Sequence, residues 1–371
     1  MSAMAGDWVQ SPRCNFVQFG HATMSKNILQ QCPKSACKKQ LSKSRRISGD
    51  CEIMKQTYNL ALFGAGTIAK KIAEAAVQNE RLCLYAVASR KVENAKAFAD
   101  RYGIQQVFEG YDEMLSDNQI DLIYISTPTK FHYEHIKICL LAGKNVICEK
   151  PFVETVEQAM ELKQLAESRK LFLMDALWTM YMPIMDELSE YTKQIGKINY
   201  STASLGYPSV SKDDSGKLKS RYDLWDYAVY PLATTIFLRG EPLTLKSKSK
   251  STDGIVVKNC TKLKYENGSA RLFSSLLHRS TYMLALVGTK GMIFARKWWF
   301  GRFPIIIWKY PFKFDVLKFK HEINGYEYEL NEAIKCLDCG TTETDRYSLS
   351  NAVSVLKWAE QMEIYECRRL I

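Results

Sequence analysis

Short apolar runs alternate with amphipathic segments over residues 57–175, and this alternation restricts the fold more than any other feature of the chain. The runs are YNLALFG, RLCLYAVAS, DLIYIST, NVICE and LFLMDA. Strands that are apolar on both faces lie in parallel sheets covered by helices on each side. The pattern therefore predicts βαβ units and a parallel sheet over residues 57–175.

The peptide GAGTIA directly follows the first apolar run and opens the first amphipathic segment. In a dinucleotide-binding turn, the first glycine allows the tight bend and the second lets the backbone approach a pyrophosphate. The third position is small so that helix and strand can pack, and the N–H groups at the helix start face the phosphates. The alternative is a glycine turn that binds nothing. The predicted cofactor-binding residues of this turn are Gly64, Gly66, Thr67, Ile68 and Ala69.

The end of the second apolar run indicates which dinucleotide binds. Sites that prefer NAD usually have Asp or Glu there to hold the ribose hydroxyls, whereas an arginine suits the 2′-phosphate of NADP. This chain has Ser89 and Arg90 at that position. We therefore predict that the cofactor is NADP rather than NAD. The alternative is a solvated arginine at the start of a helix.

Two more loops follow apolar runs, at the predicted carboxyl edge of the sheet, where doubly wound folds bind ligands. In STPTKFH, Thr127 and Pro128 form the loop, and His132 either faces the nicotinamide or caps the next helix. In VICEKPFVE, Lys150 is expected to project into the crevice beside the cofactor, and the pattern assigns no role to its neighbour Glu149. The predicted cofactor-binding set is completed by Thr127, Pro128, His132, Glu149 and Lys150. A surface lysine is the alternative for Lys150.

Beyond residue 175 the pattern changes. Two helical segments, PIMDELSEYTKQIG and DLWDYAVYPLATTIFLRG, precede strand-like segments in which ENGS and GTKG are typical of hairpin turns. A final helix is expected over residues 348–365. We predict a second domain over residues 176–371, for substrate binding and dimerisation. The predicted fold class is α/β, with an N-terminal Rossmann dinucleotide-binding domain and a C-terminal α/β domain with an open, mostly antiparallel sheet.

Three segments in this order and spacing resemble the glucose–fructose oxidoreductase and inositol dehydrogenase family: GAGTIA, STPTKFHYEHIKICLLAGKNVICEKP and WDYAVY. Within that family, MDALWTMYMP is most similar to the branch of dimeric dihydrodiol dehydrogenases and NADP-dependent xylose dehydrogenases. The resemblance covers residues 57–365. It implies a Rossmann domain, an open-faced α/β domain, and hydride transfer between NAD(P) and a secondary alcohol or hemiacetal of a sugar or trans-dihydrodiol.

Such a reaction needs a base for the hydroxyl proton and a positive field near the developing alkoxide. In WDYAVY, Asp226 and Tyr230 are four residues apart, and hence neighbours on one helix face. The pKa of a tyrosine lies near ~10 and falls beside an ammonium or an oxidised nicotinamide. We predict Tyr230 as the acid/base, Lys150 as its electrostatic partner and Asp226 as an orienting residue, and the family implies the same catalytic pair. The alternative for Tyr230 is a tyrosine of the core.

Two positions depart from the family's pattern. Ala228 replaces the glycine of Asp-x-Gly-x-Tyr, and its methyl group can narrow the approach of the helix to the cofactor. Met180 replaces the arginine of Trp-Thr-Arg, which removes a charged contact to cofactor or substrate. Both changes keep open a second function, a non-catalytic NAD(P)-binding sensor or regulatory protein of the same fold.

The formal net charge of +11 is concentrated in residues 1–56, which hold nine Lys or Arg and three Asp or Glu residues. The remainder has an ordinary enzyme surface, so we expect no nucleic-acid partner. Residues 1–56 lack sustained periodicity and are predicted to be a mostly disordered extension, with an organelle transit peptide as the alternative.

The stretch RKWWFGRFPIIIWKYPFKF mixes basic and aromatic residues. Such mixing occurs in proteins that bind single-stranded nucleic acid. An open sheet must bury its apolar face, however, and we therefore predict a homodimer through the C-terminal sheet, as the family resemblance also implies.

The remaining composition excludes other classes. No apolar run approaches the ~18–20 residues of a membrane-spanning helix, so no membrane association is expected. Eleven cysteines without a secretory signal favour a reducing, cytoplasmic location. Cys336 and Cys339 form a CxxC that lacks a second ligand pair, and no metal site is predicted.

Overall fold

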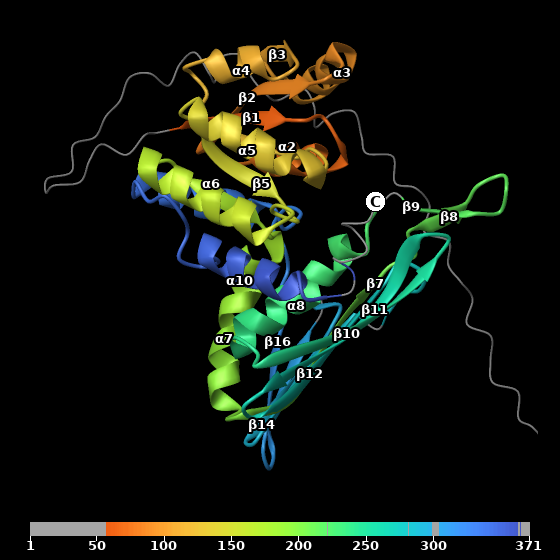
Figure 1. Ribbon diagram of the computed structural model, residues 1–371. Coiled ribbons are helices and arrows are strands. Elements are labelled where there is room, and N and C mark those ends of the chain that lie inside the picture. The colour runs from red at the N-terminus through yellow and green to blue at the C-terminus, as the bar shows by residue number, and fades with distance from the viewer. Residues whose placement is uncertain (1–56, 221, 281, 299–303, 363, 365–371) are drawn as a thin grey trace, which may run out of the picture. The chain divides into compact units, whose positions relative to one another are not determined.

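The computed structural model describes residues 57–362, except residues 221, 281 and 299–303, together with residue 364. The extension predicted over residues 1–56 lies outside these described residues, as does part of the aromatic stretch. Figure 1 draws the described helices and strands in colour.

Six parallel strands form the first sheet, in the order β3-β2-β1-β4-β5-β6. They are β1 (Tyr58–Phe63), β2 (Leu82–Ser89), β3 (Gln106–Glu109), β4 (Leu122–Ile125), β5 (Asn145–Glu149) and β6 (Leu173–Ala176). Every strand except β3 arises from one of the predicted apolar runs; β3 is a partly exposed edge strand without such a run. The strand order reverses between β1 and β4, and ligands of doubly wound sheets bind outside the carboxyl ends of the strands at such a point.

Helices connect these strands as the periodicity predicts. They are α2 (Thr67–Ala76), α3 (Val92–Tyr102), α4 (Asp112–Ser116), α5 (His132–Leu141) and α6 (Val156–Arg169), with a single 3-10 turn at Thr129–Phe131. Gly103 ends α3 with φ 71°, a left-handed conformation that favours glycine. The hydroxyl of Thr155 accepts the Gln158 N–H and caps the start of α6.

The second sheet has eight strands, in the order β10-β11-β12-β7-β13-β14-β15-β16. They are β7 (Ile198–Gly206), β10 (Thr244–Thr252), β11 (Ile255–Tyr265), β12 (Gly268–Ser275), β13 (Met283–Gly288), β14 (Gly291–Arg296), β15 (Ile305–Lys309) and β16 (Lys313–Leu317). A separate hairpin contains β8 (Val210–Lys212) and β9 (Leu218–Ser220). All neighbours in the large sheet are antiparallel except β7 and β12, so the predicted, mostly antiparallel sheet is confirmed.

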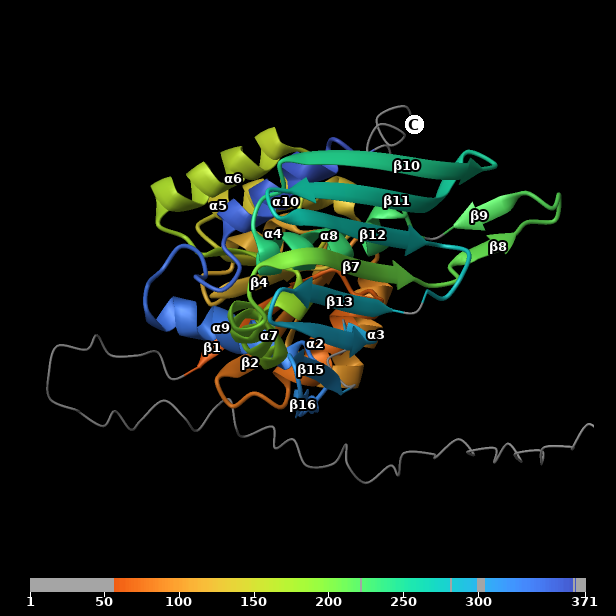
Figure 2. The same ribbon diagram turned by 90° about the horizontal axis from the view of Figure 1, so that it is seen from below.

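Helix α8 packs against β7 and β12, on one face of this sheet (Figure 2). The remaining helices are α7 (Pro183–Gln194), α8 (Trp225–Arg239), α9 (Glu327–Asp338) and α10 (Leu349–Ala359), and a 3-10 turn spans Trp178–Tyr181. Helix α10 begins at the predicted position, where the Ser348 and Asn351 side chains form a capping box. It ends at Ala359, earlier than the predicted residue 365.

The chain returns to the parallel sheet after the second sheet is complete. Helix α10 packs on α6 and β6, and α9 packs on α2. Next to this contact, the Leu173 N–H donates to the Thr342 carbonyl at 2.9 Å. Residues after the predicted domain boundary at 175–176 therefore also pack on the first sheet. The boundary itself stays a prediction. In the described part of the chain, no helix has the length and apolar character needed to cross a membrane.

Candidate active site

The turn after β1 has the shape that a bound pyrophosphate requires. Gly64 has φ +112°, and a Cβ there would lie 3.2 Å from the Ser126 hydroxyl oxygen. Both the backbone conformation and the lack of space therefore disfavour a side chain at this position. Around Gly66, by contrast, nothing lies within 4 Å of an added Cβ, which leaves open space before α2. No side chain caps α2, and its first N–H groups have no partner within the helix. Ala69 is fully buried, as helix–strand packing requires. These groups fit a dinucleotide phosphate.

Ser89 and Arg90 lie at the carboxyl end of β2. Ser89 is the last residue of the strand and is half-buried, whereas Arg90 is exposed. The guanidinium carbon of Arg90 lies 5.9 Å from the centroid of the Phe131 ring, which comes from the loop after β4. A planar cation at this edge fits the 2′-phosphate of NADP.

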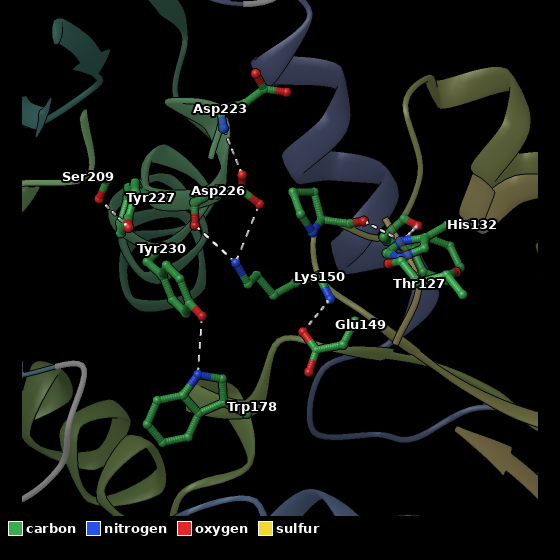
Figure 3. Close-up of polar contacts among 12 residues, drawn as sticks. Thr127, His132, Glu149, Lys150, Trp178, Ser209, Asp223, Asp226, Tyr227 and Tyr230 are labelled. Atoms are coloured by element: carbon green, nitrogen blue, oxygen red, sulfur yellow. Dashed lines mark hydrogen bonds and ion pairs between the residues drawn. The ribbon is translucent and has the colours of Figure 1, made fainter. Parts of the chain in front are cut away.

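His132 joins two loops of the sheet instead of capping the next helix. It is the first residue of α5 and only 1% exposed. Its Nε2 contacts the Thr127 carbonyl at 2.7 Å, and its Nδ1 contacts the carbonyls of Pro151 and Phe152 at 2.9 and 3.0 Å (Figure 3). The ring thus lies between the loop after β4 and the loop after β5 and contacts both. The alternative that His132 caps α5 is wrong, because no side chain caps that helix; a contact with nicotinamide stays a prediction. The Thr127 hydroxyl contacts His135 Nδ1 at 2.9 Å.

Lys150 meets α8 at the carboxyl edge of the first sheet. Its Nζ donates to the Asp226 carbonyl oxygen at 3.2 Å and lies 3.7 Å from Asp226 Oδ1 (Figure 3). The same Nζ lies 5.3 Å from the centroid of the Tyr230 ring. The side chains of Lys150 and Asp226 are 17% and 22% exposed, so solvent reaches the pair only in part. The fold therefore brings together three residues that are up to eighty positions apart in the sequence.

Two aromatic residues of the site were not predicted. Trp178 Nε1 donates to the Tyr230 hydroxyl at 3.1 Å (Figure 3). The indole in turn stacks on Tyr326, with ring centroids 5.3 Å apart and an interplanar angle of 16°. Trp178 comes almost directly after β6, and this position at a carboxyl strand end is the signal by which it could have been found. Tyr326 precedes α9 and is far in sequence from the strands of the first sheet, so no such signal marks it.

The charges around Tyr230 act in opposite directions. Burial raises the pKa of Tyr230, Lys150 lowers it and Glu149 raises it, and the net result is a pKa of about 12. The predicted lowering by Lys150 is thus present, but the chain's own groups do not bring the value below that of a free tyrosine. Burial lowers the pKa of Lys150, but electrostatic interactions with Tyr230, Asp226 and Glu149 more than offset this effect and hold that pKa above its usual range. Lys150 therefore stays an ammonium ion.

The positions that depart from the family's pattern are both in the interior. Ala228 is 2% exposed in α8, and Met180 is fully buried in the turn after β6. Neither side chain displaces Lys150, Asp226 or Tyr230 from their common site. Thr67 and Ile68 are the first two residues of α2, which follows the turn after β1, and Pro128 lies in the loop after β4.

A parallel sheet with a glycine turn that fits a phosphate, joined to a sheet domain that supplies an acid/base candidate, is typical of dinucleotide-dependent oxidoreductases. Residues 58–176 match the family described as "Oxidoreductase family, NAD-binding Rossmann fold". Residues 58–176 thus form a domain of the glucose–fructose oxidoreductase and inositol dehydrogenase family, and the predicted family is confirmed for this domain.

Curated relatives extend the similarity beyond this domain. The trans-1,2-dihydrobenzene-1,2-diol dehydrogenase of Xenopus laevis is 28% identical over 72% of this chain and 84% of the relative. The NADP-dependent scyllo-inositol 2-dehydrogenase of Bacillus subtilis is 28% identical over 63% of this chain and 74% of the relative. The NADP-dependent D-xylose 1-dehydrogenase of Hypocrea jecorina is 33% identical over 40% of this chain and 44% of the relative.

Solved structures are similar in fold. A 3-ketoreductase from Actinomadura kijaniata in complex with NADP has a TM-score of 0.71 and 21% identity, and the match covers 82% of this chain and 96% of that chain. At this identity the likeness concerns the fold, and it confirms the predicted pairing of a Rossmann domain with a mostly antiparallel sheet domain.

Proposed function

We propose that this protein is an NADP-dependent oxidoreductase that acts on a secondary alcohol or hemiacetal of a sugar or trans-dihydrodiol. The observation that carries the proposal is the convergence of Lys150, Asp226 and Tyr230 at the carboxyl edge of the dinucleotide-binding sheet. The names of the relatives support the substrate class, and the exposed Arg90 after β2 supports NADP.

In this proposal Tyr230 takes the proton from the substrate hydroxyl, or returns it in the reverse direction. The Lys150 ammonium stabilises the negative charge that develops on the substrate oxygen and on the phenol. Asp226 keeps the Lys150 ammonium in place, because its carbonyl accepts one of the three N–H groups of Lys150. The bound nicotinamide supplies the hydride acceptor or donor.

In the test, purified full-length protein is incubated with NADP or NAD and a panel of aldoses, inositols and trans-dihydrodiols. Turnover is followed by the absorbance of the reduced nicotinamide. Turnover of at least one substrate class is expected, with NADP preferred over NAD. Tight NADP binding without turnover of any substrate in the panel would contradict the enzymatic proposal and favour the sensor or regulatory protein.

We also propose that the protein is a homodimer through the outer face of the second sheet. In β15 and β16, Ile306, Phe314 and Val316 are 43%, 60% and 54% exposed, whereas Ile307 on the opposite face of β15 is fully buried. The register places Ile306 beside Val316, and Trp308 beside Phe314, on this outer face. A contiguous exposed apolar patch of this kind is typical of a protein interface.

The variant Ile306→Lys is expected to convert the dimer into a monomer, because two buried ammonium groups would face the interface without partners. Light scattering on a size-exclusion column measures the change from twice the chain mass to the single mass. Leu243→Lys is the matched control, because Leu243 is 59% exposed but lies before β10 at the other edge of the sheet. A dimeric Ile306→Lys protein would refute this interface.

A further inference from the structure

Three buried carboxyl groups lie behind Lys150, and the proposed reaction uses none of them. Glu149 ends β5, Asp175 lies in β6 and Glu329 lies in α9, with exposed fractions of 4%, 5% and 0%. Buried carboxylates cost free energy unless they are paired or protonated. Lys150 is a neighbouring cation of Glu149 and Asp175, and Lys71 is a second one of Glu149, but two ammonium groups do not neutralise three carboxylates. At least one of these groups must hold a proton.

The position of a proton follows from the contacts of Tyr124, a fully buried residue of β4. Its hydroxyl oxygen lies 2.8 Å from Glu149 Oε1 and 2.7 Å from Glu329 Oε1. Both separations are typical of O–H···O hydrogen bonds, and each such bond needs one hydrogen. A phenol has a single hydrogen to donate. One of the two carboxyl groups must therefore be a neutral acid that donates to the phenol oxygen.

The surroundings of the two glutamates decide between them. Glu149 Oε2 accepts the backbone N–H of Lys150 at 3.2 Å, and the charges of Lys150 and Lys71 favour its ionised form. Burial nevertheless raises the pKa of Glu149 to about 7. Burial and the nearby carboxyls of Glu149 and Asp175 raise the pKa of Glu329 well above its usual range, against the hydrogen bond from Tyr124. Glu329 Oε2 is buried and has no hydrogen-bond partner among the described residues.

We propose that Glu329 is a protonated positioning residue: its carboxyl donates to Tyr124, and Tyr124 donates to Glu149. This arrangement leaves Glu149 ionised and bonded to the backbone of Lys150, and so fixes the loop that presents the ammonium. The chain of hydrogen bonds stands on the contacts of Tyr124 and on the burial and charges around the two glutamates, whereas its effect on turnover rests on the proposed function.

Other titratable groups surround the three carboxyls on the elements packed against them. They are Lys71 on α2, Cys148 on β5, Lys150 after β5, Tyr181 in the turn after β6, Tyr230 on α8, Tyr326 and Glu332 at α9, and Tyr347 before α10. Burial, followed by the nearby Glu149, also raises the pKa of Asp175 to about 8. The two lysines are the cations of this set, and both affect Glu149.

A raised carboxyl pKa makes folding depend on pH with a definite sign. The folded chain keeps a proton that the unfolded chain releases above the usual glutamate pKa of about 4.3. Stability is therefore complete below that value and falls as the pH rises toward the pKa of the folded chain. In this window the folding equilibrium constant falls about tenfold per pH unit for each retained proton.

The experiment measures urea unfolding of the cofactor-free protein at several values between pH 5 and pH 8. Glu329→Gln replaces the acid by an amide that donates to Tyr124 at every pH, and its slope is expected to be shallower than that of the wild type by one proton, about tenfold per pH unit. Glu327→Gln is the matched control on the same helix. Although burial opposes it, the backbone N–H groups of Ile323, Asn324 and Gly325 hold the pKa of Glu327 below its usual range, so this variant should keep the wild-type slope above pH 6.

A slope of Glu329→Gln equal to that of the wild type overturns the proposal. Should the variant not fold, proton release on unfolding is measured with Asp175→Asn, because Asp175 would itself release a proton at pH 7. Unfolding this protein at pH 7 must still release about one proton per chain, and release of none overturns the assignment. Both measurements are made without substrate, so they remain valid if the proposed function fails. In turnover, the rise of wild-type kcat with pH is expected to stop where Glu329 loses its proton, whereas kcat of Glu329→Gln should continue to rise, which a purely structural role would not produce.

Discussion

Replacing Tyr230 with Phe is expected to lower kcat by about 10²- to 10⁴-fold, the range that general acid–base groups contribute. The loss equals about 3–5 kcal/mol of transition-state stabilisation. The variant removes only the hydroxyl that receives the Trp178 hydrogen bond, and the ring keeps its place 5.3 Å from the Lys150 ammonium. NADP affinity, measured by fluorescence titration, should change little. Steady-state rates with the substrate found in the panel measure kcat.

Tyr227→Phe is the matched control for this prediction. Tyr227 lies three residues earlier on α8, and its hydroxyl contacts the Ser209 hydroxyl at 2.7 Å, away from Lys150 (Figure 3). Its removal should alter kcat far less. Since the chain's own groups raise the pKa of Tyr230 to about 12, the rate of alcohol oxidation should rise with pH below the pKa of Tyr230 in the complex. A near-normal rate for Tyr230→Phe, or an unchanged rise with pH, would exclude Tyr230 as the base.

Replacing Arg90 with Ala is expected to weaken NADP binding by roughly 10- to 150-fold, because a charged hydrogen bond contributes about 1.5–3 kcal/mol. The affinity for NAD should change much less, since NAD lacks the 2′-phosphate. Dissociation constants of both dinucleotides, measured at one fixed ionic strength, give the comparison.

Arg101→Ala controls for the loss of one positive charge. Arg101 lies in the last turn of α3, where its guanidinium carbon is 5.4 Å from the Tyr102 ring centroid. This variant should bind both dinucleotides almost as the wild type does. Equal weakening of NADP and NAD by Arg90→Ala would refute the preference for NADP.

The first sheet was predictable from the sequence because each of its buried strands is a continuous apolar run. The strand β5, with the sequence NVICE, agrees with its prediction at both ends. The edge strand β3 was missed because two of its four residues are exposed and no apolar run marks it. In the second sheet, β7 was missed for a related reason: its sequence INYSTASLG mixes polar and apolar residues and contains no apolar run, and tertiary contacts with β12 and β13 determine its conformation.

Residues of the candidate site were predictable only where a chemically reactive side chain has a local sequence signal, such as the end of a strand or a shared helix face. Lys150 follows a strand and Tyr230 shares a helix face with Asp226, so both have a local signal. The hydrogen bond from Trp178 to Tyr230 joins residues 52 positions apart, and the hydrogen bond between Tyr124 and Glu329 joins residues 205 positions apart. Such pairs depend on how the second half of the chain returns to the first sheet, and no local pattern contains that information.

This return has a consequence for how the chain is made. On the ribosome, β1 to β6 emerge long before α9 and α10, whose residues cover β6, α6 and α2. Until translation reaches about residue 359, the nascent dinucleotide-binding half exposes the apolar surface that these helices later bury. Until then Tyr124 also lacks Glu329, and Leu173 lacks Thr342, as a hydrogen-bond partner. The dinucleotide-binding half is therefore synthesised first but cannot finish folding until the C-terminal helices are available. Chaperones that bind nascent chains would encounter this half while it is still incompletely folded.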